Sequence, residues 1–376
     1  MMTASRKIGL YVHVPFCRQR CHFCAFYLEI ARTERMDAFR SALTQEIDLY
    51  RRQDLLKGRP LESIYFGGGT PTAMPVGHLI SILDLVRATW PISPSAEVTV
   101  EAHPSTVTAE DLKRFAEAGF TRVSFGAESM NDQDFAAIGR PGTTEDTKSA
   151  VAAARAAGFT NINLDLMYGL PGQSLVDWIR TLRSLLALAP SHVSCYALTL
   201  EAGTRLAQNI ARGLVSKPDD ALQVDMEATA ETLLAKAGLA RYEISNYARQ
   251  GAACRHNLLY WTDQDYLGLG PSAQSYVDGV RFGNIADLTD YVGMLEESRL
   301  PIMERTVLSD SERQRDALVF GLRLLSGVPL NAIHDPEQRQ KLHALVSQGL
   351  LESDPERVRL TSLGQRYADT VAGQLF

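Results

Sequence analysis

The sequence contains no uninterrupted apolar run close to the roughly 20 residues that a membrane-spanning helix requires. Residues 1–7 are polar and no apolar secretory segment follows them, so we expect a cytoplasmic protein. Lys and Arg form no long basic run and the formal net charge is −6. Because binding phosphates requires clustered cations, nucleic acid is not expected as an obligate partner. The 376 residues are enough for one large globular domain or two.

Cysteine is scarce, yet three of the five cysteines lie in one short segment. Cys17, Cys21 and Cys24 follow an apolar, strand-like run at residues 8–14. Iron–sulfur clusters are held by Cys thiolates, usually four to a [4Fe–4S] cluster. Three thiolates from one loop would leave one iron free to bind a small molecule. The spacing therefore favours redox chemistry over a purely structural role.

Other uses of these cysteines are possible in principle. Three neighbouring cysteines cannot all pair as disulfides, and the expected compartment is reducing. Structural zinc usually takes four nitrogen or sulfur ligands, of which His13 or His22 would supply the fourth. Cys195 lies in a strand-like run and is expected in the core, whereas the role of Cys254 stays open.

From residue 8 to about residue 200, strand-like and helical stretches alternate. The β-branched or aromatic runs lie at residues 8–14, 63–66, 97–101, 122–125, 161–166 and 192–198. Between them, apolar positions recur every three or four residues at 35–52, 76–88, 109–118, 144–157 and 175–188. The alternation predicts an α/β fold with a parallel sheet, curved or barrel-like. Right-handed crossovers would bring the C-terminal ends of all strands to one rim, where such sheets bind ligands.

The pattern changes after residue 200. Residues 219–237 are typical of a long amphipathic helix, and residues 241–276 are dense in aromatic residues and glycine. Residues 309–376 are mainly helical, with strand-like runs at 350–351 and 358–360. We therefore expect three parts, which are residues 1–200, a connecting segment at 201–300 and a small winged-helix-like unit at 301–376.

Glycine and polar residues follow several of the predicted strands. Three glycines at residues 67–69 and Thr70 come directly after the second strand, where glycine lets a ligand approach the backbone. The loop lacks the Lys-Ser/Thr pair of a nucleoside-triphosphate loop. Further polar side chains at or after strand ends are Glu101, Glu128, Arg140 and Asp165. A single acid could be a helix cap, but a series along one rim predicts a binding site.

Residues 11–17 (YVHVPFC), with Cys21 and Cys24, resemble the opening of radical S-adenosylmethionine (SAM) enzymes. More narrowly, the chain resembles the branch that contains oxygen-independent coproporphyrinogen oxidase, HemN, and the haem chaperone HemW. The likeness continues through residues 65–71, 165–173, 241–247 (RYEISNY) and 256–261 (HNLLYW), of which the last two resemble HemW-like proteins. It implies a partial (β/α)6 barrel followed by an α+β C-terminal HemN-like domain.

The resemblance also implies roles for individual residues. Cys17, Cys21 and Cys24 would hold a [4Fe–4S] cluster whose open iron binds the amino and carboxylate groups of SAM. The residues around the cofactors would be Tyr11, Gly68, Gly69, Thr70, Glu101, Glu128, Arg140 and Asp165. Reduction by a flavodoxin- or ferredoxin-type donor would cleave SAM to a 5′-deoxyadenosyl radical.

The chain departs from the family at several positions. Residue 26 is Phe, as in HemW-like proteins, whereas coproporphyrinogen oxidases carry a further cysteine there, so the coproporphyrinogen dehydrogenase reaction is disfavoured. Glu128 replaces a Gln, and Pro141 and Gln274 stand where His is expected. Two candidate imidazole ligands for haem are thus missing. His256 remains, either as a haem ligand or as part of a packed turn.

Two functions are compatible with the resemblance. The first is a HemW-type chaperone that binds a cluster, SAM and haem and delivers haem to client proteins. The second is a class C radical SAM methyltransferase, or a cyclopropane-forming relative, which binds two SAM molecules. The motifs at residues 241–261 favour the first, and Glu128 and the missing histidines favour the second. A zinc-stabilised binding protein ranks behind both.

Overall fold

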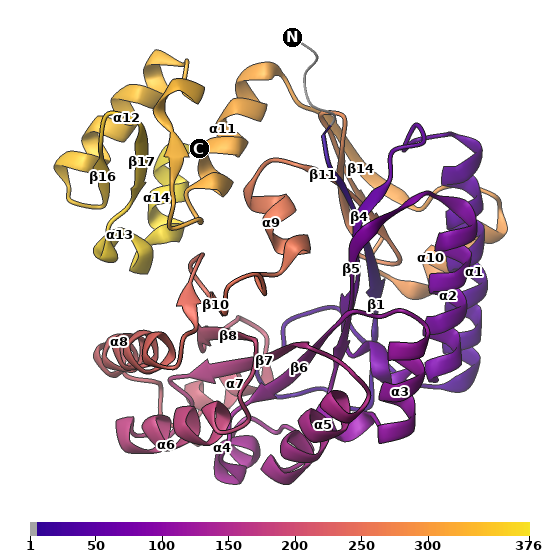
Figure 1. Cartoon of the computed structure of the whole chain (residues 1–376), viewed down its shortest axis with the longest axis horizontal. Helices are drawn as coiled ribbons and strands as arrows, with labels where there is room; N and C mark the ends of the chain where they lie inside the picture. Colours follow the sequence, from indigo (N-terminus) through magenta and orange to yellow (C-terminus); the bar gives the residue numbers. More distant parts are fainter. Residues whose placement is uncertain (1–5) are drawn as a thin grey trace.

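A computed structural model describes residues 6–376. Its centre is a run of parallel neighbouring strands, each at a position predicted from the sequence and most of them longer than predicted. In order along the sheet they are β1 (Ile8–Val14), β4 (Leu61–Gly68), β5 (Ile92–Ala102), β6 (Arg122–Glu128), β7 (Asn161–Tyr168) and β8 (His192–Ala197). The strands curve into an open, partial barrel (Figure 1), and the predicted α/β class is confirmed.

Helices cover the convex face of this sheet (Figure 1). They are α1 (Thr33–Arg52), α2 (Val76–Thr89), α3 (Ala109–Glu117), α4 (Asp132–Ala137), α5 (Thr144–Ala156) and α6 (Leu175–Leu186). Capping boxes at Thr108, Thr143 and Ser174 start α3, α5 and α6 and satisfy their first free amides. The sequence analysis missed α4, because six residues are too few to show a helical period.

Strand alternation separates the core from the concave face. In β1, Leu10, Val12 and Val14 are fully buried in the hydrophobic core. The residues between them, Tyr11 and His13, line the cavity on the other side of the sheet. The polar rim therefore comes from the alternate positions of strands whose other positions build the core.

Residues 201–300 extend this sheet at both edges. Beyond β1 follow β11 (Asp265–Leu269), β12 (Gln274–Val277) and β13 (Val280–Asn284), and beyond β8 follow β10 (Asn246–Ala248) and β9 (Ala240–Arg241). β14 (Ile302–Val307) pairs with β13 although it lies past residue 300, where we expected the C-terminal unit to begin. The helices of this part are α7 (Arg205–Ala211), α8 (Asp220–Lys236), α9 (Arg255–Trp261) and α10 (Leu288–Glu296).

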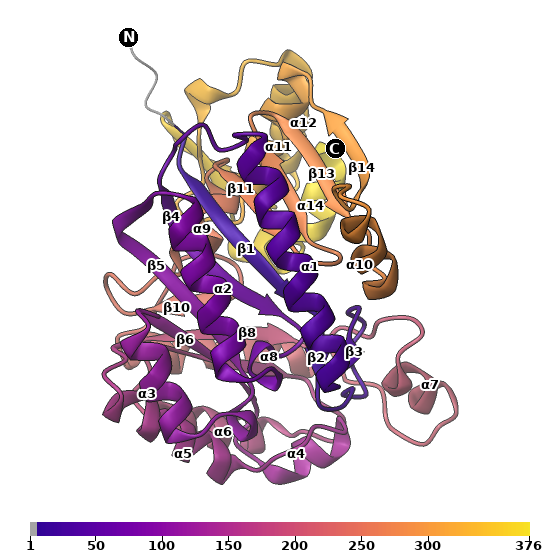
Figure 2. The same ribbon diagram turned by 90° about the vertical axis from the view of Figure 1, so that its right-hand side faces the viewer.

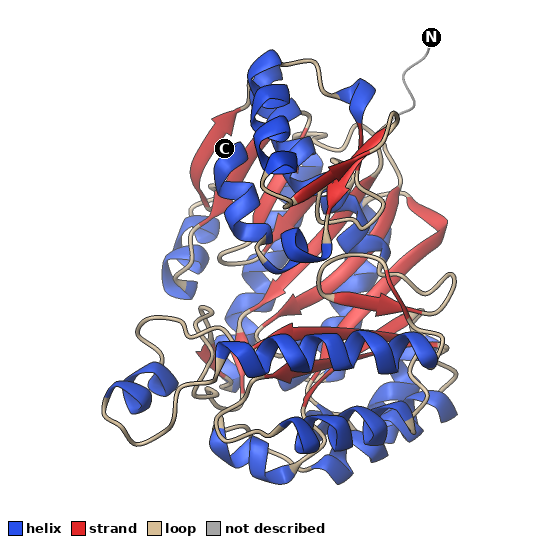
Figure 3. Ribbon diagram, turned by 90° about the vertical axis from the view of Figure 1, so that its left-hand side faces the viewer, coloured by secondary structure: helices blue, strands red, loops and turns tan. Residues whose placement is uncertain are grey.

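The last part of the chain forms a small unit with its own core. Its elements are α11 (Asp310–Gly321), β15 (Val328–Pro329), η3 (Leu330–Ala332), α12 (Pro336–Ser347), β16 (Leu351–Ser353), β17 (Arg357–Leu360), α13 (Ser362–Arg366) and α14 (Ala368–Leu375). Leu345, Leu360 and Leu375 belong to a hydrophobic cluster separate from that of the barrel. Figure 3 shows this unit in the upper part of the view, next to the open side of the barrel.

Short elements surround the cysteine segment. β2 (Phe16–Cys17) pairs with β3 (Glu29–Ile30), and the 3₁₀ turns η1 (Pro71–Ala73) and η2 (Pro104–Thr106) follow β4 and β5. Figure 2 shows β2 and β3 at the end of β1, with α7 projecting beside them. The amide of Leu206 in α7 donates to the carbonyl of His22 at 2.8 Å. The start of α7 therefore contacts the cysteine segment.

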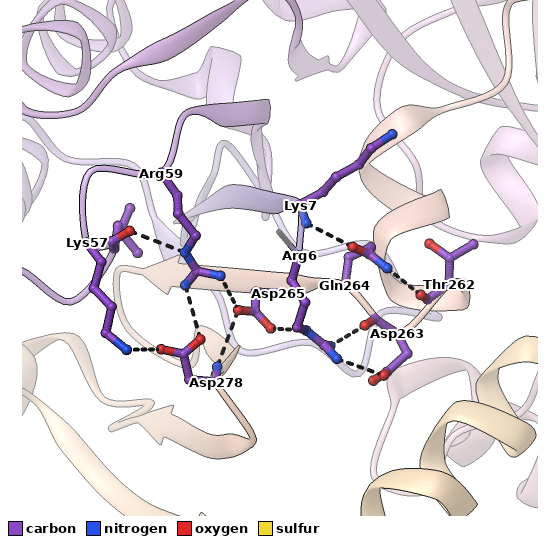
Figure 4. Close-up of polar contacts among 10 residues, drawn as sticks. Arg6, Lys7, Lys57, Arg59, Thr262, Asp263, Gln264, Asp265 and Asp278 are labelled. Atoms are coloured by element: carbon purple, nitrogen blue, oxygen red, sulfur yellow. Dashed lines mark hydrogen bonds and ion pairs between the residues drawn. The ribbon is translucent and has the colours of Figure 1, made fainter. Parts of the chain in front are cut away.

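The opposite end of the barrel carries an ion-pair network (Figure 4). Asp265, at the start of β11, is fully buried and accepts from Arg6 Nε at 2.8 Å and from Arg59 Nη1 at 2.6 Å. Asp263 pairs with Arg6 at 2.9 Å, and Asp278 lies 3.5 Å from Arg59. The network ties the segment before β1 to the strands beside it. No helix in residues 6–376 combines the length and apolar character needed to cross a membrane.

Candidate cofactor site

One cavity of about 1140 Å³ runs through the concave side of the barrel. The three clustered cysteines line one end, and aromatic residues of β11, β12 and α11 line the other. Every residue that the sequence analysis assigned to cofactors lines this cavity: Tyr11, Cys17, Cys21, Cys24, Gly68, Gly69, Thr70, Glu101, Glu128, Arg140, Asp165 and His256. Residues from six strands, three loops and one helix thus meet at one place.

The three cysteines are partly exposed, whereas Cys195 and Cys254 are buried. The amide of Cys24 donates to the carbonyl of Cys21 at 3.3 Å, and Cys17 Sγ lies 3.4 Å from Thr70 Oγ1. Burial raises the pKa of Cys21 to about 11, although the nearby Arg140 guanidinium lowers it. Among residues 6–376, no three His, Cys, Asp or Glu side chains converge closely enough to hold a single ion.

The glycine loop after β4 brings its backbone against the cysteine segment. Gly68 has a φ of 114°, a conformation that favours glycine. A Cβ at Gly69 would lie 2.8 Å from the carbonyl oxygen of Phe16. The amide of Thr70 donates to the same carbonyl at 2.7 Å. Only glycine allows this approach, which holds Thr70 beside Cys17.

Glu101, near the end of β5, lies at the centre of the rim. Its carboxylate accepts from Tyr65 Oη at 2.7 Å and from the amide of Gly68 at 3.3 Å. Burial raises the pKa of Glu101 to about 7, an effect that these two hydrogen bonds oppose. No Lys or Arg in residues 6–376 forms an ion pair with it. The site therefore contains a partly buried acid that has no ion pair within the described residues.

Glu128 ends β6 in the left-handed region, with a φ of 61°. The register of the β6–β7 pairing shifts between Gly126 and Glu128, which turns the Glu128 side chain into the cavity. Its carboxylate accepts from Tyr196 Oη at 3.2 Å and lies 3.8 Å from Arg140 Nη1. Burial raises the pKa of Glu128 to about 7, and Arg140 lowers it. Strained backbone of this kind is often found at functional sites.

Arg140 and Asp165 complete the rim. Arg140 donates to the carbonyl of Gly126, and its Nη1 lies 3.9 Å from Cys21 Sγ. Asp165 accepts from Asn163 Nδ2 at 2.7 Å and from Ser124 Oγ at 3.5 Å. Burial raises the pKa of Asp165. Arg140 thus lies between the cysteine segment and the acids.

His256 lies in α9 and is almost fully buried. Its Nδ1 is hydrogen-bonded to Ser63 Oγ at 2.8 Å and its Nε2 to Tyr260 Oη at 2.7 Å. Burial lowers the pKa of His256 to about 3, so the ring is neutral. Ligation of an iron by His256 would require Ser63 or Tyr260 to release a ring nitrogen.

Pro141 and Gln274, where we expected departures from the family, also line the cavity, as does Phe26, where coproporphyrinogen oxidases were expected to differ. Sequence reasoning did not single out Tyr65 and Tyr196, whose hydroxyls bond to the two glutamates. Their alternation with core positions in β4 and β8 is the signal that would have found them. The sequence also provides no signal for the cavity lining from β13 and α11, which consists of Arg281, Asp316 and Phe320.

Comparison with known proteins identifies the family. Residues 11–185 match the model of the radical SAM superfamily, and residues 308–367 match the HemN C-terminal domain. "Heme chaperone HemW" of Mycobacterium tuberculosis (strain CDC 1551 / Oshkosh) is 34% identical over 98% of this chain and 95% of that protein. "Heme chaperone HemW" of Bacillus subtilis (strain 168) is 32% identical over 96% and 97%.

Among solved structures, the coproporphyrinogen III oxidase HemN of Escherichia coli superposes with a TM-score of 0.86. It is 23% identical and the match covers 98% of this chain and 90% of that one, so it establishes the shared fold. The fold and the sequence matches define a radical SAM protein, a class that uses a [4Fe–4S] cluster and SAM. Within that superfamily, the chain belongs to the HemN/HemW-like family.

Proposed function

We propose that this protein is a haem chaperone that holds a [4Fe–4S] cluster and SAM at one end of its cavity and haem at the other. The main observation that supports this proposal is the size and lining of the cavity. Its volume of about 1140 Å³ exceeds the roughly 300–1,000 Å³ of a pocket for one drug-sized ligand. The cavity extends from three partly exposed thiols to the aromatic residues of β11, β12 and α11. This aromatic end suits a second, flat ligand beside SAM.

The donor set at the first end fits an iron–sulfur cluster. Cys17, Cys21 and Cys24 are the partly exposed cysteines, and all three line the cavity. When bound, the cluster and SAM supply reductive cleavage of a carbon–sulfur bond. Thr70 and Arg140, which lie 3.4 Å from Cys17 Sγ and 3.9 Å from Cys21 Sγ, donate toward the thiolates and favour their ionised form.

The polar rim is suited to the charged parts of SAM. Glu101 offers a carboxylate to the amino group, and the backbone at Gly68 and Gly69 allows close approach. Arg140 is placed to meet a carboxylate, and Asp165 to accept from ribose hydroxyls. Glu128 and Tyr11 line the same space. These side chains bind and orient the cofactor, and the barrel walls exclude water.

Haem delivery is proposed from the relatives. Two relatives more than 30% identical over almost the whole chain carry the name "Heme chaperone HemW". We extend haem binding and transfer to client proteins to this chain, together with reduction by a flavodoxin- or ferredoxin-type donor. Phe26 lines the cavity where a further cysteine would serve coproporphyrinogen oxidation, which favours carriage over that reaction.

A methyltransferase or cyclopropane-forming enzyme with two SAM molecules is the second candidate. It is favoured by Glu128 and Gln274, two cavity-lining residues that depart from the family. A carboxylate at residue 128, with its pKa raised by burial to about 7, could accept a proton where an amide could not.

One anaerobic experiment separates the two functions. The reconstituted protein is mixed with SAM and dithionite and assayed by mass spectrometry for 5′-deoxyadenosine and S-adenosylhomocysteine, while haemin is titrated into a parallel sample. The chaperone predicts a stoichiometric Soret shift with little SAM turnover. Both SAM-derived products without a Soret shift would contradict it and support the methyltransferase.

A further inference from the structure

The end of the cavity far from the cysteines is lined by aromatic side chains. We call this the aromatic compartment, and its residues are Tyr260, Trp261, Tyr266, Tyr276 and Phe320. The rings of Tyr260 and Tyr266 meet edge to face at 4.6 Å, and those of Tyr266 and Tyr276 lie 6.3 Å apart. Such surfaces accept flat, apolar ligands.

The compartment is built by both parts of the molecule. Tyr266 comes from β11 and Tyr276 from β12 of the barrel sheet, whereas Phe320 comes from α11 of the C-terminal unit. Figure 1 shows α11 between the rest of that unit and the β11–β14 edge of the sheet. The C-terminal unit therefore closes the cavity rather than lying apart from it.

A core-packing role does not account for these side chains. Tyr266, Trp261 and Phe320 keep part of their surface exposed to the cavity. Trp261 Nε1 and Tyr276 Oη are buried without a hydrogen-bond partner in residues 6–376. Orphaned polar atoms on aromatic rings are uncommon in a finished core.

One charged pair lies in the same compartment. Arg281 Nη2 of β13 donates to Asp316 Oδ2 of α11 at 2.8 Å. The Arg281 side chain is 40% exposed and that of Asp316 only 7%. Nη2 is the one side-chain nitrogen of Arg281 with a hydrogen-bond partner within the described chain. The other guanidinium nitrogens of Arg281 can therefore donate hydrogen bonds to an acceptor group of a bound ligand.

Within residues 6–376, the arginines that line the cavity are Arg18, Arg140 and Arg281, and the first two lie in or beside the cysteine segment. Two arginines near the aromatic compartment do not line the cavity and have other contacts. Arg6 is held by Asp263 and Asp265. Arg323 lies over the ring of Trp261 at 4.5 Å and 3.5 Å from Glu243. Arg281 is therefore the guanidinium best placed to bind an acid in this compartment.

We propose that Arg281 anchors a carboxylate of the ligand while the aromatic compartment covers the ligand's flat ring. This inference rests on the proposed function, so the ligand is haem and the anchored group is a propionate. Asp316 holds the guanidinium in place and competes weakly with the propionate for it. The C-terminal unit thus supplies part of the haem site.

The test compares haemin with haemin dimethyl ester, whose propionates are masked. Both are titrated anaerobically into the cluster-loaded protein and followed by visible absorption. We expect Arg281→Ala to weaken haemin binding about tenfold or more, as for loss of a hydrogen bond to a charged group. Binding of the ester should not change, because it has no carboxylate to lose.

Two further variants separate anchoring from folding. Arg299→Ala removes an arginine that is also paired with a carboxylate, Glu297, but does not line the cavity, and it should leave both titrations unchanged. Asp316→Asn frees Arg281 from its partner and should leave haemin binding equal or tighter. If Asp316→Asn and Arg281→Ala both weakened haemin and ester alike, the pair would be structural and the anchor would be refuted.

The titrations also distinguish failure of the proposed haem-chaperone function from failure of the Arg281 anchor. If the wild-type protein took up no haemin, the chaperone proposal would fall, and this inference with it. If the wild type bound haemin stoichiometrically while Arg281→Ala bound it equally well, only the anchor would be overturned.

Discussion

The two ends of the barrel contain the same kind of residue in opposite electrostatic settings. At the end that starts the strands, buried Asp265 lies between two arginines at 2.6 and 2.8 Å. At the other end, Glu101 and Asp165 are partly buried and have no ion pair in residues 6–376, and desolvation raises their pKa values. Buried charges are normally paired. We therefore infer a structural network at the first end and, at the second, a site where the cationic part of a ligand would pair with the acids.

The largest effect is expected where the ligands of the cluster are removed. Cys21→Ala should abolish the cluster, because two thiolates cannot hold it. Iron and sulfide content after anaerobic reconstitution measures this loss. Cys195→Ala is the matched control, since Cys195 is buried outside the cavity lining, and it should keep full iron. Full iron in Cys21→Ala would overturn the ligand assignment.

At the end of the barrel where the strands begin, we expect a substitution to change the stability of the protein. Asp265→Asn leaves Arg6 and Arg59 without their shared carboxylate. We expect a loss of about 2–3 kcal/mol in the free energy of unfolding, below the roughly 3–5 kcal/mol for a broken buried pair because both arginines retain some exposure. Chemical denaturation measures it. SAM affinity per folded molecule should be unchanged, and a large fall in that affinity would erase the contrast between the two ends.

At the rim of the barrel, we expect a substitution to change the affinity for SAM. Glu101→Gln should weaken SAM binding about tenfold, because an amide accepts less strongly from the amino group than a carboxylate does. Calorimetry on the cluster-loaded protein measures the affinity. The cluster should remain, and so should its visible absorbance. An unchanged affinity would remove Glu101 from the site.

The same residue predicts a pH dependence. The pKa of Glu101 is raised from about 4.5 to about 7, so below pH 7 the free protein carries the protonated acid. SAM favours the ionised form, so its affinity should be constant well above pH 7 and fall as the pH decreases below it, with a contribution from Glu101 of about tenfold in all, the loss expected for Glu101→Gln. Glu128 has a similar pKa, so Glu101→Gln should reduce the slope without removing it. A wild-type affinity that rises toward low pH would have the wrong sign.

The smallest effect is expected at His256. Both of its ring nitrogens are engaged, so His256→Ala should leave the position of the Soret band of bound haemin unchanged. A shifted band would show that His256 ligates the iron. Tyr260→Phe, which releases only Nε2, then tests whether that nitrogen becomes available.

The sequence predicted one end of the cavity far better than the other. The six parallel strands of the barrel, the long helices between them and the convergence of the rim follow from local periodicity and from the chirality of crossovers, whereas α10 was not predicted. The aromatic compartment does not, because β11, β12 and β13 are short and join the sheet beside β1 from more than 200 residues away in the chain. The contact between Arg281 and Asp316 depends on how α11 docks, which no local pattern encodes. The engagement of His256 by Ser63 is likewise a long-range contact.

Thermal unfolding of the cluster-loaded protein, with and without saturating SAM, tests the contrast between the two ends most directly. The midpoint without SAM reports stability, and the shift on adding SAM reports binding. We predict that Asp265→Asn lowers the midpoint and keeps the full shift, whereas Glu101→Gln keeps the midpoint and loses about half of the shift when SAM is at about 100 times the wild-type Kd. The account would be contradicted if Asp265→Asn abolished the shift, or if Glu101→Gln lowered the midpoint and kept the full shift.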